Sequence, residues 1–565
     1  MQKTLSGSRI LMEALLAEGV DTLFGYPGGA IMPTYDALYD YRDRLNHILV
    51  RHEQGAAHAA EGYARVSGRT GVCLVTSGPG VTNTVTGVAD AMIDSTPIVV
   101  IAGQVGAAML GTDAFQEVDV VDMMQPVCKW AYQIRRPEDV AWAVSRAFYI
   151  AGSGRPGPVV LDFTRNAQVE EAEYHEERVR FIRSYVPVPS TSEQSLRNAA
   201  ALINAARRPL VLVGQGVELG GAQAELRAFL EKADAPAGCT LLGLSALPTD
   251  HPLNMGMLGM HGALATNRMT QQADLIVAVG MRFDDRITGR LDTYARQAKK
   301  IHLDIDPSEI NKNVTVDVAV LGDCKTTLPA LTALVSQADR AAWRAAFTPH
   351  RDEERRIVIE PQVHPADGPL RMGEVVRRVT ELTADRAVMV TDVGQNQMMA
   401  ARYFRFTLPR SVVTSGGMGT MGYGLPAAIG ATFGAPERTV CLFIGDGGLQ
   451  MTIQELGTIM EQGAPVKIVL LNNNYLGNVR QWQQLFWQRR YSFTPMMNPD
   501  YEQVATAYGI ASRTVTRRDD LDDAIREMLG TPGAFLLQCA VEEEDNVMPM
   551  CPPGHDVDDM MLTVQ

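Results

Sequence analysis

The sequence predicts an α/β protein built from three doubly wound parallel-sheet domains. Short apolar runs rich in Val, Ile and Leu alternate with longer amphipathic segments, for example PIVVIAG near residue 97, LIVAVG near residue 275 and VCLFIGDGG near residue 440. Strands buried on both faces of a parallel sheet have this composition. Several runs end in Gly or a small polar residue, where ligand-binding loops follow strands in such sheets. A chain of 565 residues also exceeds what one hydrophobic core supports, which favours several domains.

Two stretches rich in Pro, Ser and charged residues interrupt this rhythm: VPVPSTSEQS at 186–195 and TPHRDEERRIVIEPQVHPADGP at 348–369. Such clusters are typical of connections between domains. We therefore expect domains at 1–185, 195–345 and 368–545, followed by a C-terminal tail at 546–565. The first and third domains show strand and helix alternation of similar size, which indicates two related domains flanking a different one.

The composition argues against several classes of protein. A net charge of -14 without a long basic run disfavours nucleic-acid binding. The seven Cys are scattered and form no CxxC pair, which indicates free thiols in a reducing compartment and no zinc site. No apolar stretch approaches the roughly 20 residues that span a bilayer, and Glu13 and Glu18 interrupt any signal-peptide core. We expect a cytoplasmic protein that binds neither membrane nor nucleic acid.

The clearest chemical motif joins two strand ends. The run VCLFI leads into Gly445-Asp446-Gly447, and a second run, VKIVLL, leads into three asparagines at 472–474. Mg²⁺ prefers oxygen ligands, which Asp446 and Asn473 would supply from adjacent strand ends. The two glycines let the backbone approach a diphosphate, and the helix that follows would present free N–H groups to it. A lone Gly-Asp-Gly is usually an ordinary turn, so the pairing carries this prediction.

This pairing is the signature of thiamine-diphosphate enzymes, and further motifs make the chain resemble the catalytic subunit of the acetohydroxyacid synthases (acetolactate synthases) over nearly its whole length. These motifs are YPGGA at 26–30, RHEQGA at 51–56, TSGPG at 76–80, GTDAFQE at 111–117, MLGMHG at 257–262, RFDDRITG at 282–289, TSGGMGTMGYGLPAAIGA at 414–431 and RQWQQLF at 480–486. The resemblance implies three domains of the thiamine-diphosphate enzyme type. They would bind, in chain order, the aminopyrimidine, FAD, and the diphosphate with Mg²⁺.

The implied reaction is the decarboxylation of pyruvate and the condensation of the hydroxyethyl group with pyruvate or 2-oxobutyrate, in branched-chain amino acid biosynthesis. Glu53 in RHEQGA resembles the glutamate that protonates or hydrogen-bonds the coenzyme's aminopyrimidine, so that this group can remove the thiazolium proton. The family places the coenzyme between the first domain of one subunit and the third domain of another. The resemblance therefore implies a homodimer or homotetramer with active sites at the interface, and it leaves room for a small regulatory subunit.

Further roles follow from motif positions. Gly29 and Gln116 resemble pocket residues that stabilise a developing oxyanion. The resemblance also implies thiamine-diphosphate contacts from Gln395, Gly419 and Met421, and a main-chain metal ligand from Tyr475. The implied FAD contacts are Met260, His261, Arg282, Asp304 and Asp306.

The substrate residues implied by the family are Phe115, Arg165, Arg286 and Trp482. Arg286 resembles the cation that captures the second 2-oxo acid's carboxylate, although an Arg after two aspartates is by default a surface ion pair. Trp482 resembles the aromatic wall that favours 2-oxobutyrate. One methylene is worth only about 1–3 kcal/mol in such a pocket.

Three residues depart from the family pattern. Arg165 stands in Thr-Arg-Asn where Lys is usual, Asn396 where His is usual, and Asn478 where Met is usual. They leave the pocket polarity and the acceptor preference open. The alternatives are an FAD-independent catabolic acetolactate synthase, another thiamine-diphosphate carboligase, or a non-catalytic paralogue that acts as a binding subunit.

Overall fold

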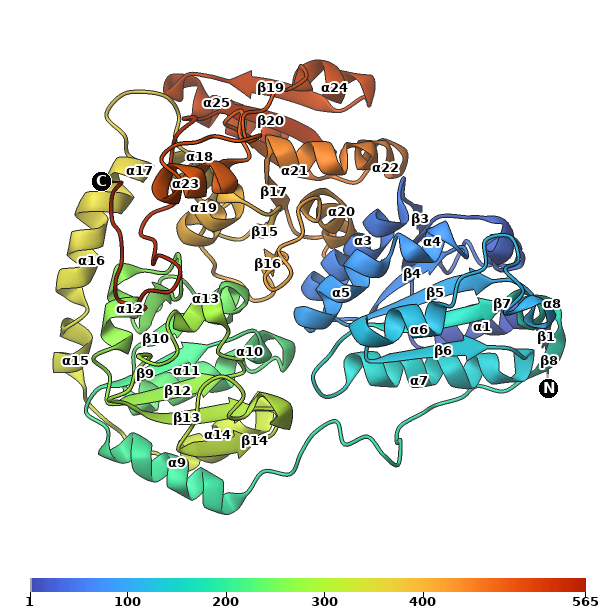
Figure 1. The fold of residues 1–565 in the computed structure, drawn as a ribbon, viewed down its shortest axis with the longest axis horizontal. Helices are drawn as coiled ribbons and strands as arrows, with labels where there is room; N and C mark the ends of the chain where they lie inside the picture. The colour runs from blue at the N-terminus through green and yellow to red at the C-terminus, as the bar shows by residue number, and fades with distance from the viewer. Residues whose placement is uncertain (1–2, 565) are drawn as a thin grey trace.

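In the computed structural model, which describes residues 3–564, the chain forms three six-stranded parallel sheets with flanking helices (Figure 1). This arrangement confirms the predicted fold class. Successive side chains of a strand enter different hydrophobic clusters: Val72 and Leu74 pack in one, Cys73 and Val75 in another. Both faces of the sheet are therefore covered, which explains why its strands are continuous apolar runs.

The first and third sheets have the same strand order. When the strands of each sheet are numbered along the chain, this order is 2-1-3-4-6-5. The first sheet is β3 (Asn46–Leu49), β2 (Thr22–Gly25), β4 (Gly71–Val75), β5 (Ile98–Gln104), β7 (Val159–Thr164) and β6 (Trp130–Ile134). The third is β16 (Val412–Val413), β15 (Val388–Thr391), β17 (Val440–Gly445), β18 (Lys467–Asn472), β20 (Phe535–Ala540) and β19 (Ala511–Val515). The shared order indicates that these two domains are related.

The middle sheet has a different strand order, which is 3-2-1-4-5-6 in the same numbering. These are β11 (Asn254–Met257), β10 (Ala237–Cys239), β9 (Pro209–Val213), β12 (Leu275–Val279), β13 (Lys299–Asp304) and β14 (Val318–Leu321). This is the order of dinucleotide-binding folds, which hold their ligand where the order reverses, here between β9 and β12.

Helices flank each of the three sheets. The main ones in the first domain are α1 (Gly7–Ala17), α3 (Glu53–Ser67), α5 (Val85–Ile93) and α7 (Val140–Gly152). In the middle domain they are α9 (Glu193–Ala205), α11 (Gln223–Ala233), α12 (Leu264–Thr270) and α14 (Cys324–Leu334). In the third they are α18 (Met372–Leu382), α19 (Gln395–Tyr403), α20 (Gly424–Gly434), α21 (Asp446–Met451), α22 (Leu456–Gln462), α23 (Gly477–Phe486), α24 (Tyr501–Ala507) and α25 (Leu521–Gly530).

The first and third domains meet where α3 crosses α20 (Figure 1). A Cβ atom at Gly62 would lie 2.0 Å from the carbonyl oxygen of Ala427, and one at Gly430 would lie 1.8 Å from that of Ala59. Only glycine permits this backbone contact. The crossing fixes the two domains relative to each other within one chain.

Two segments expected to lie outside the domains, the connection at 348–369 and the C-terminal tail at 546–565, are ordered in the structure. The charged stretch after the middle sheet is helical, as α16 (Thr348–Glu354), a π-helical turn (Arg355–Ile359) and α17 (Glu360–Val363). The C-terminal segment folds back onto the middle domain, where the Cys551 amide donates to the Met260 carbonyl at 2.8 Å. Within residues 3–564 we find no helix long and apolar enough to cross a membrane.

Candidate active site

The predicted metal ligands lie together at the carboxyl edge of the third sheet. Asp446 follows β17 and Asn473 follows β18, and these strands are neighbours in the sheet. Both side chains are buried. Asn498 Nδ2 donates to Asp446 Oδ2 at 2.7 Å. Burial raises the pKa of Asp446, so a cation that replaced the proton would stabilise the carboxylate in this position.

The loop after β18 holds the second ligand in place. Asn473 Nδ2 donates to Gln395 Oε1 at 3.2 Å, which leaves the amide oxygen as the atom free to bind a cation. The Tyr475 amide donates to that oxygen at 3.4 Å, a long contact that an ion could replace. Asn474 has a φ of 57°, so the chain turns sharply and brings Tyr475 back toward Asn473.

The glycines predicted to face a diphosphate are closely surrounded. A Cβ at Gly447 would lie 2.7 Å from Leu476 Cδ2 and 3.5 Å from Met421 Cε. Met421 therefore lies beside the Gly-Asp-Gly turn, as expected for a residue that shapes the coenzyme site. Gly445 precedes α21 in extended backbone, so the N-terminus of α21 opens directly onto this edge of the sheet.

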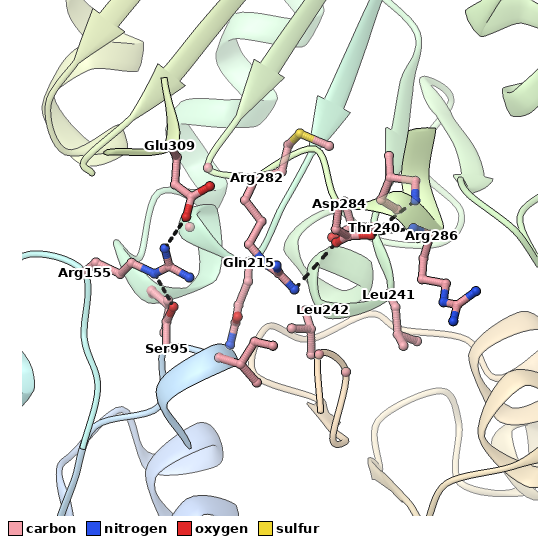
Figure 2. A pocket seen from close by; sticks show the side chains of 18 of the residues that line it. Ser95, Arg155, Gln215, Thr240, Leu241, Leu242, Arg282, Asp284, Arg286 and Glu309 are labelled. Atoms are coloured by element: carbon pink, nitrogen blue, oxygen red, sulfur yellow. Dashed lines mark hydrogen bonds and ion pairs between the residues drawn. The ribbon is translucent and has the colours of Figure 1, made fainter. Parts of the chain in front are cut away.

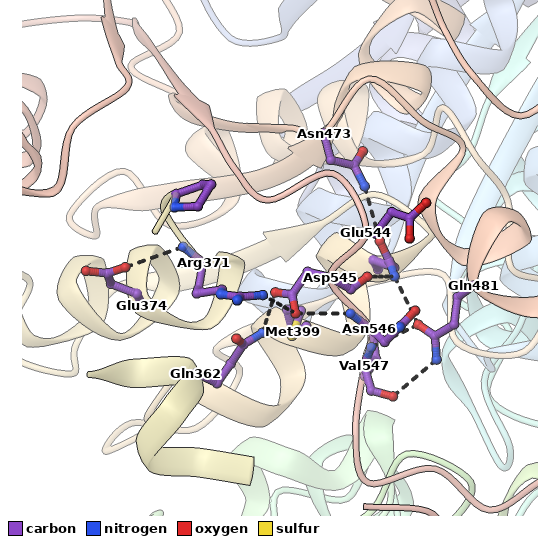
Figure 3. A network of polar contacts seen from close by, with 12 residues as sticks. Gln362, Arg371, Glu374, Met399, Asn473, Gln481, Glu544, Asp545, Asn546 and Val547 are labelled. Carbon is purple, nitrogen blue, oxygen red and sulfur yellow. Dashed lines mark hydrogen bonds and ion pairs between the residues drawn. The ribbon is translucent and has the colours of Figure 1, made fainter. Parts of the chain in front are cut away.

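A network of polar contacts joins Asn473, at the carboxyl edge of the third sheet, to Asp545 near the C-terminal segment (Figure 3). Gln395 links the two. Its Nε2 donates to Gln481 Oε1 at 2.9 Å and to the Asp545 carbonyl at 2.7 Å. Asp545 in turn accepts from Gln362 Nε2 at 2.6 Å. The side chain expected to contact the diphosphate thus positions Asn473 in this structure, and its main chain at the start of α19 is the part that faces the same edge.

Asp392 is a buried carboxylate that the sequence analysis missed. It accepts from the backbone amides of Val393 at 2.8 Å, Gly422 at 3.0 Å and Gly424 at 2.9 Å. Burial raises its pKa to about 6, against these three donors. Because it anchors both ends of the turn after Met421, it fixes the loop that shapes the predicted coenzyme site.

The three residues that depart from the family pattern have different surroundings. Asn396 Nδ2 donates to the Asp392 and Phe443 carbonyls, each at 3.0 Å, so this amide is part of the backbone framework. Asn478 lines the large cavity described below. Arg165 begins α8 (Arg165–Val169) and is exposed.

The predicted catalytic residues of the first domain come from three loops that meet at the carboxyl edge of its sheet. Glu53 is the first residue of α3, and its Oε2 accepts from Asn83 Nδ2 at 2.9 Å. A Cβ at Gly80 would lie 3.6 Å from Glu53 Oε1, and one at Gly78 would lie 2.9 Å from the Gln116 carbonyl. The motifs RHEQGA, TSGPG and GTDAFQE are therefore neighbours in space.

Two other predicted residues of this domain are open to solvent. Gly29 begins a short 3-10 turn after β2, and a Cβ there would meet nothing within 4 Å among the described residues. Phe115 is 88% exposed, which is unusual for so large an apolar side chain. This edge of the first domain is thus uncovered in one chain.

A cavity of about 760 Å³ lies between the three domains (Figure 2). It holds four of the predicted FAD residues together with two predicted substrate residues and one predicted coenzyme residue, which are Met260, His261, Arg282, Asp304, Arg286, Trp482 and Gly419. Its volume is in the range of small-molecule and cofactor sites. Neither Glu53 nor Asp446 is among the described residues that line it.

The floor of the cavity is the switch point of the middle sheet. The Gly216 amide donates to the Gly280 carbonyl at 3.0 Å, and a Cβ at Gly216 would lie 2.6 Å from the Gly280 Cα. The backbones after β9 and β12 therefore touch, and a ligand can approach their main-chain groups. Gly216 belongs to the run GQGVELG, which is a weak motif by itself. The fold places this run at the point where the strand order of the middle sheet reverses.

One wall comes from the first domain through Arg155, which the sequence analysis also missed. Its guanidinium donates to Glu309 Oε1 at 2.7 Å and to Ser95 Oγ at 2.8 Å (Figure 2). It also donates to Asp306 Oδ2 at 3.2 Å. Arg155 therefore holds Asp306 in place. Asp306 Oδ1 also accepts a hydrogen bond from the Ser308 amide at 2.9 Å, which caps a short turn. It stands behind the cavity wall, whereas Asp304 lines it.

The opposite end of the cavity carries Arg286 and Trp482. Arg286 lies in α13 (Asp285–Thr288), and its side chain is 60% exposed and 3.8 Å from Asp285. An ion pair at this distance and exposure contributes little, so the guanidinium is available to a ligand. Trp482 is half-buried and meets Phe486 edge to face.

His261 presents an acceptor or donor to the same cavity. Burial, with the nearby Arg402 and Arg286 charges, lowers its pKa to about 3, so the imidazole is neutral at physiological pH. Within residues 3–564, its Nδ1 atom has no hydrogen-bond partner. A buried, unpaired ring nitrogen is costly unless a ligand meets it.

Comparison with known proteins identifies the class first. Residues 5–123, 196–331 and 392–539 match, respectively, the N-terminal TPP binding domain, the central domain and the C-terminal TPP binding domain of the thiamine pyrophosphate enzymes. The fold, with its two related outer domains, is that of this class.

Full-length relatives narrow the class. The chain is 45% identical to the acetolactate synthase isozyme 2 large subunit of Escherichia coli (strain K12), covering 99% of each chain. It is 40% identical to the acetolactate synthase large subunit of Lactococcus lactis, covering 99% of this chain and 97% of the relative. A probable acetolactate synthase large subunit of Methanocaldococcus jannaschii is also 40% identical, with 97% and 94% covered. The chain belongs to the acetolactate synthase large-subunit family, and it is a thiamine-diphosphate-dependent carboligase.

Proposed function

We propose that this enzyme decarboxylates pyruvate and condenses the two-carbon product with a second pyruvate or with 2-oxobutyrate, using Mg²⁺ and FAD besides thiamine diphosphate. The observation that carries the proposal is the pair of buried oxygen ligands, Asp446 and Asn473, on neighbouring strand ends beside a helix N-terminus. These residues, with the Tyr475 carbonyl, would hold a hard divalent cation, which prefers oxygen ligands.

The cavity between the domains fits a flavin dinucleotide. Its volume of about 760 Å³, its place at the switch point of the middle sheet and the touching Gly216 and Gly280 backbones all support this ligand. Arg282 and Asp304 would bind its polar groups. A purified protein that is yellow and releases FAD on denaturation would agree with the proposal, and a colourless one would favour the FAD-independent relatives.

The bound coenzyme would supply a nucleophilic carbon and an electron sink for the negative charge left when a 2-oxo acid loses carbon dioxide. Glu53 would hold a proton at the aminopyrimidine nitrogen, and Asn83 would orient this carboxyl group through its 2.9 Å hydrogen bond. Gly29 and Gln116 would donate hydrogen bonds to the developing oxyanion. Arg286 would bind the carboxylate of the second 2-oxo acid.

We further propose that the active site is completed by a second copy of the chain. Large apolar side chains are exposed near the first- and third-domain edges, including Phe115 at 88%, Phe493 at 96% and Met497 at 98%. Monomers rarely expose such clusters of apolar surface. Burial against a second chain would cover them and bring Glu53 of one chain to the metal edge of the other. The "large subunit" relatives also support a smaller regulatory partner for this chain.

The direct test is an assay of the purified protein with pyruvate as the only substrate. Carbon dioxide release and acetolactate formation should both require thiamine diphosphate and a divalent cation. Carbon dioxide release without acetolactate would indicate a simple decarboxylase. The absence of both products would overturn the proposal.

Trp482→Leu is expected to reduce the preference for 2-oxobutyrate over pyruvate as acceptor by roughly 10-fold or more, because a pocket distinguishes one methylene by about 1–3 kcal/mol. Acetolactate formation from pyruvate alone should be largely retained. A competition assay that measures both products checks the ratio. Trp487→Leu is the matched control, since Trp487 is 54% exposed and outside the cavity. An unchanged product ratio in Trp482→Leu would remove this residue from acceptor selection.

A further inference from the structure

A second group of potential metal ligands lies far along the chain from Asp446, at the contact between the first and third domains. His58 and Glu61 are on α3, and Asp90 is on α5. One ligand atom from each lies within 4.8 Å of the other two. Atoms that share an ion at about 2.0–2.4 Å are separated by such distances. All three side chains are fully buried.

Three of the four carboxylate oxygens in this cluster have no donor among residues 3–564. His58 Nδ1 lies 2.9 Å from Glu61 Oε1. Both carboxylate oxygens of Asp90, and Oε2 of Glu61, have no hydrogen-bond partner among residues 3–564. Buried polar atoms are nearly always paired, so three unpaired carboxylate oxygens at one point call for a ligand that binds oxygen.

The nearest positive charge is already engaged. Arg65 Nη2 donates to Asp94 Oδ2 at 2.7 Å. Asp94 also accepts from the amides of Gly416 and Gly417 in the third domain, at 2.7 Å each. The charge of Arg65 also offsets part of the rise that burial causes in the pKa of Glu61, but one guanidinium can balance only one of the three buried carboxylates Glu61, Asp90 and Asp94.

Burying two carboxylates without a counterion is strongly unfavourable. Burial, and then the nearby Asp90, raise the pKa of Glu61 well above its ordinary value, which measures how poorly the site tolerates its charge. Burial lowers the pKa of His58 to about 4, so its imidazole is neutral, the form that binds metals. A divalent cation would neutralise both carboxylates at once.

We propose that His58, Glu61 and Asp90 bind a structural divalent cation that is separate from the catalytic ion. One imidazole with two carboxylates favours a first-row ion such as Mn²⁺ or Zn²⁺ over Mg²⁺, because imidazole is a poor ligand for Mg²⁺.

The surroundings suit such a site. Gln54 Nε2 lies 3.3 Å from His58 Nε2. With the amide turned so that its oxygen takes this place, Gln54 would accept from the Nε2–H and orient the ring through the nitrogen that does not bind the ion. The ring of Tyr423, which precedes α20, meets the His58 ring edge to face at 5.1 Å. The Tyr423 hydroxyl is buried and has no partner in the described part of the chain. The ion would therefore join α3 and α5 directly beneath the third domain.

The test measures metal content in the full-length enzyme. Cells are grown in medium supplied with Mn²⁺ and Zn²⁺, and the purified protein is dialysed against EDTA and then analysed by plasma mass spectrometry. We expect a stoichiometric amount of Mn²⁺ or Zn²⁺ to remain in the wild-type protein, because the ion is fully enclosed. Asp90→Asn should lose it, and the matched control Asp446→Asn, which alters the catalytic edge, should keep it.

Two results would overturn the proposal: a wild-type protein free of Mn²⁺ and Zn²⁺ after dialysis, or retention of the ion by Asp90→Asn. If Asp90→Asn does not fold, anomalous diffraction from wild-type crystals at the Mn and Zn absorption edges decides the matter. A peak between His58 and Asp90 supports the site, and no peak overturns it. Neither measurement depends on the enzyme's activity, so it is independent of the proposed reaction.

Discussion

Glu53→Gln is expected to lower kcat by roughly 10²- to 10⁴-fold, the range over which a positioned proton donor contributes to catalysis. Glutamine keeps the volume and can still accept the 2.9 Å hydrogen bond from Asn83, but it cannot hold a proton at the aminopyrimidine. The fold should be unaffected, because Glu53 begins α3 at a partly exposed position. Steady-state kinetics with saturating coenzyme measure the effect.

The matched control for this prediction is Glu502→Gln. Glu502 also lies in the first turn of a helix, α24, but it is exposed and is not among the candidate site residues. The control should retain the wild-type rate and melting temperature. A wild-type rate in Glu53→Gln would exclude this residue from the mechanism, and a large loss in Glu502→Gln would show that the effect is not specific.

Asp446→Asn is expected to weaken Mg²⁺ binding by at least about 100-fold, since even outer partners of metal ligands typically contribute 10- to 100-fold. The activity at low Mg²⁺ should fall accordingly and recover in part at high Mg²⁺. Titration of activity against Mg²⁺ in the presence of thiamine diphosphate measures the shift. Asp500→Asn is the control, because Asp500 caps α24 and asparagine caps helices equally well.

The same residue gives the Mg²⁺ affinity a pH dependence. Burial raises the pKa of Asp446, so without the metal its proton is retained to higher pH than in an exposed aspartate. Mg²⁺ must displace this proton, and its affinity should therefore weaken as the pH falls through the raised pKa. Asp446→Asn should lose this part of the dependence. An Mg²⁺ affinity equal to that of the wild type in Asp446→Asn would exclude the carboxylate as a ligand.

The fold was largely predictable because its strands are encoded locally. Runs such as VCLFI at 440–444 are apolar at every position, and the structure places successive residues of this strand, Cys441 and Leu442, in different hydrophobic clusters. Such a run has few stable places other than the interior of a parallel sheet. Strand ends could also be located, and with them Asp446 and Asn473.

Other parts of the site could not be predicted because they depend on contacts between distant residues. Asn498 lies in a loop that looks like an ordinary turn, yet it donates to Asp446 across 52 positions of sequence. Arg155 reaches Glu309 across 154 positions and closes a wall of the cavity. Asp392 follows β15 and belongs to none of the sequence motifs, and only the backbone amides that surround it reveal its role.

Charge was a poor guide to structure after the middle sheet. The stretch 348–369 looked like a solvated connection, but Glu354 is buried, where it forms an ion pair with Arg402 and accepts from the Leu264 amide at 2.8 Å. Its partners compensate its burial, so a charged segment can form a helix against the middle domain. The C-terminal segment is also ordered, because its backbone makes contacts with distant residues that no local sequence pattern specifies.

The central claim is that Glu53 of one chain acts on a coenzyme held by Asp446 and Asn473 of another. Its most direct test is to co-express Glu53→Gln and Asp446→Asn chains with different affinity tags and to assay the purified mixed dimers. Each mixed dimer would contain one site with both defects and one site with none, so activity should return although each variant alone is nearly inactive. If the mixed dimers remain as inactive as the separate variants, Glu53 and Asp446 belong to the same chain's site and the two-chain account is wrong.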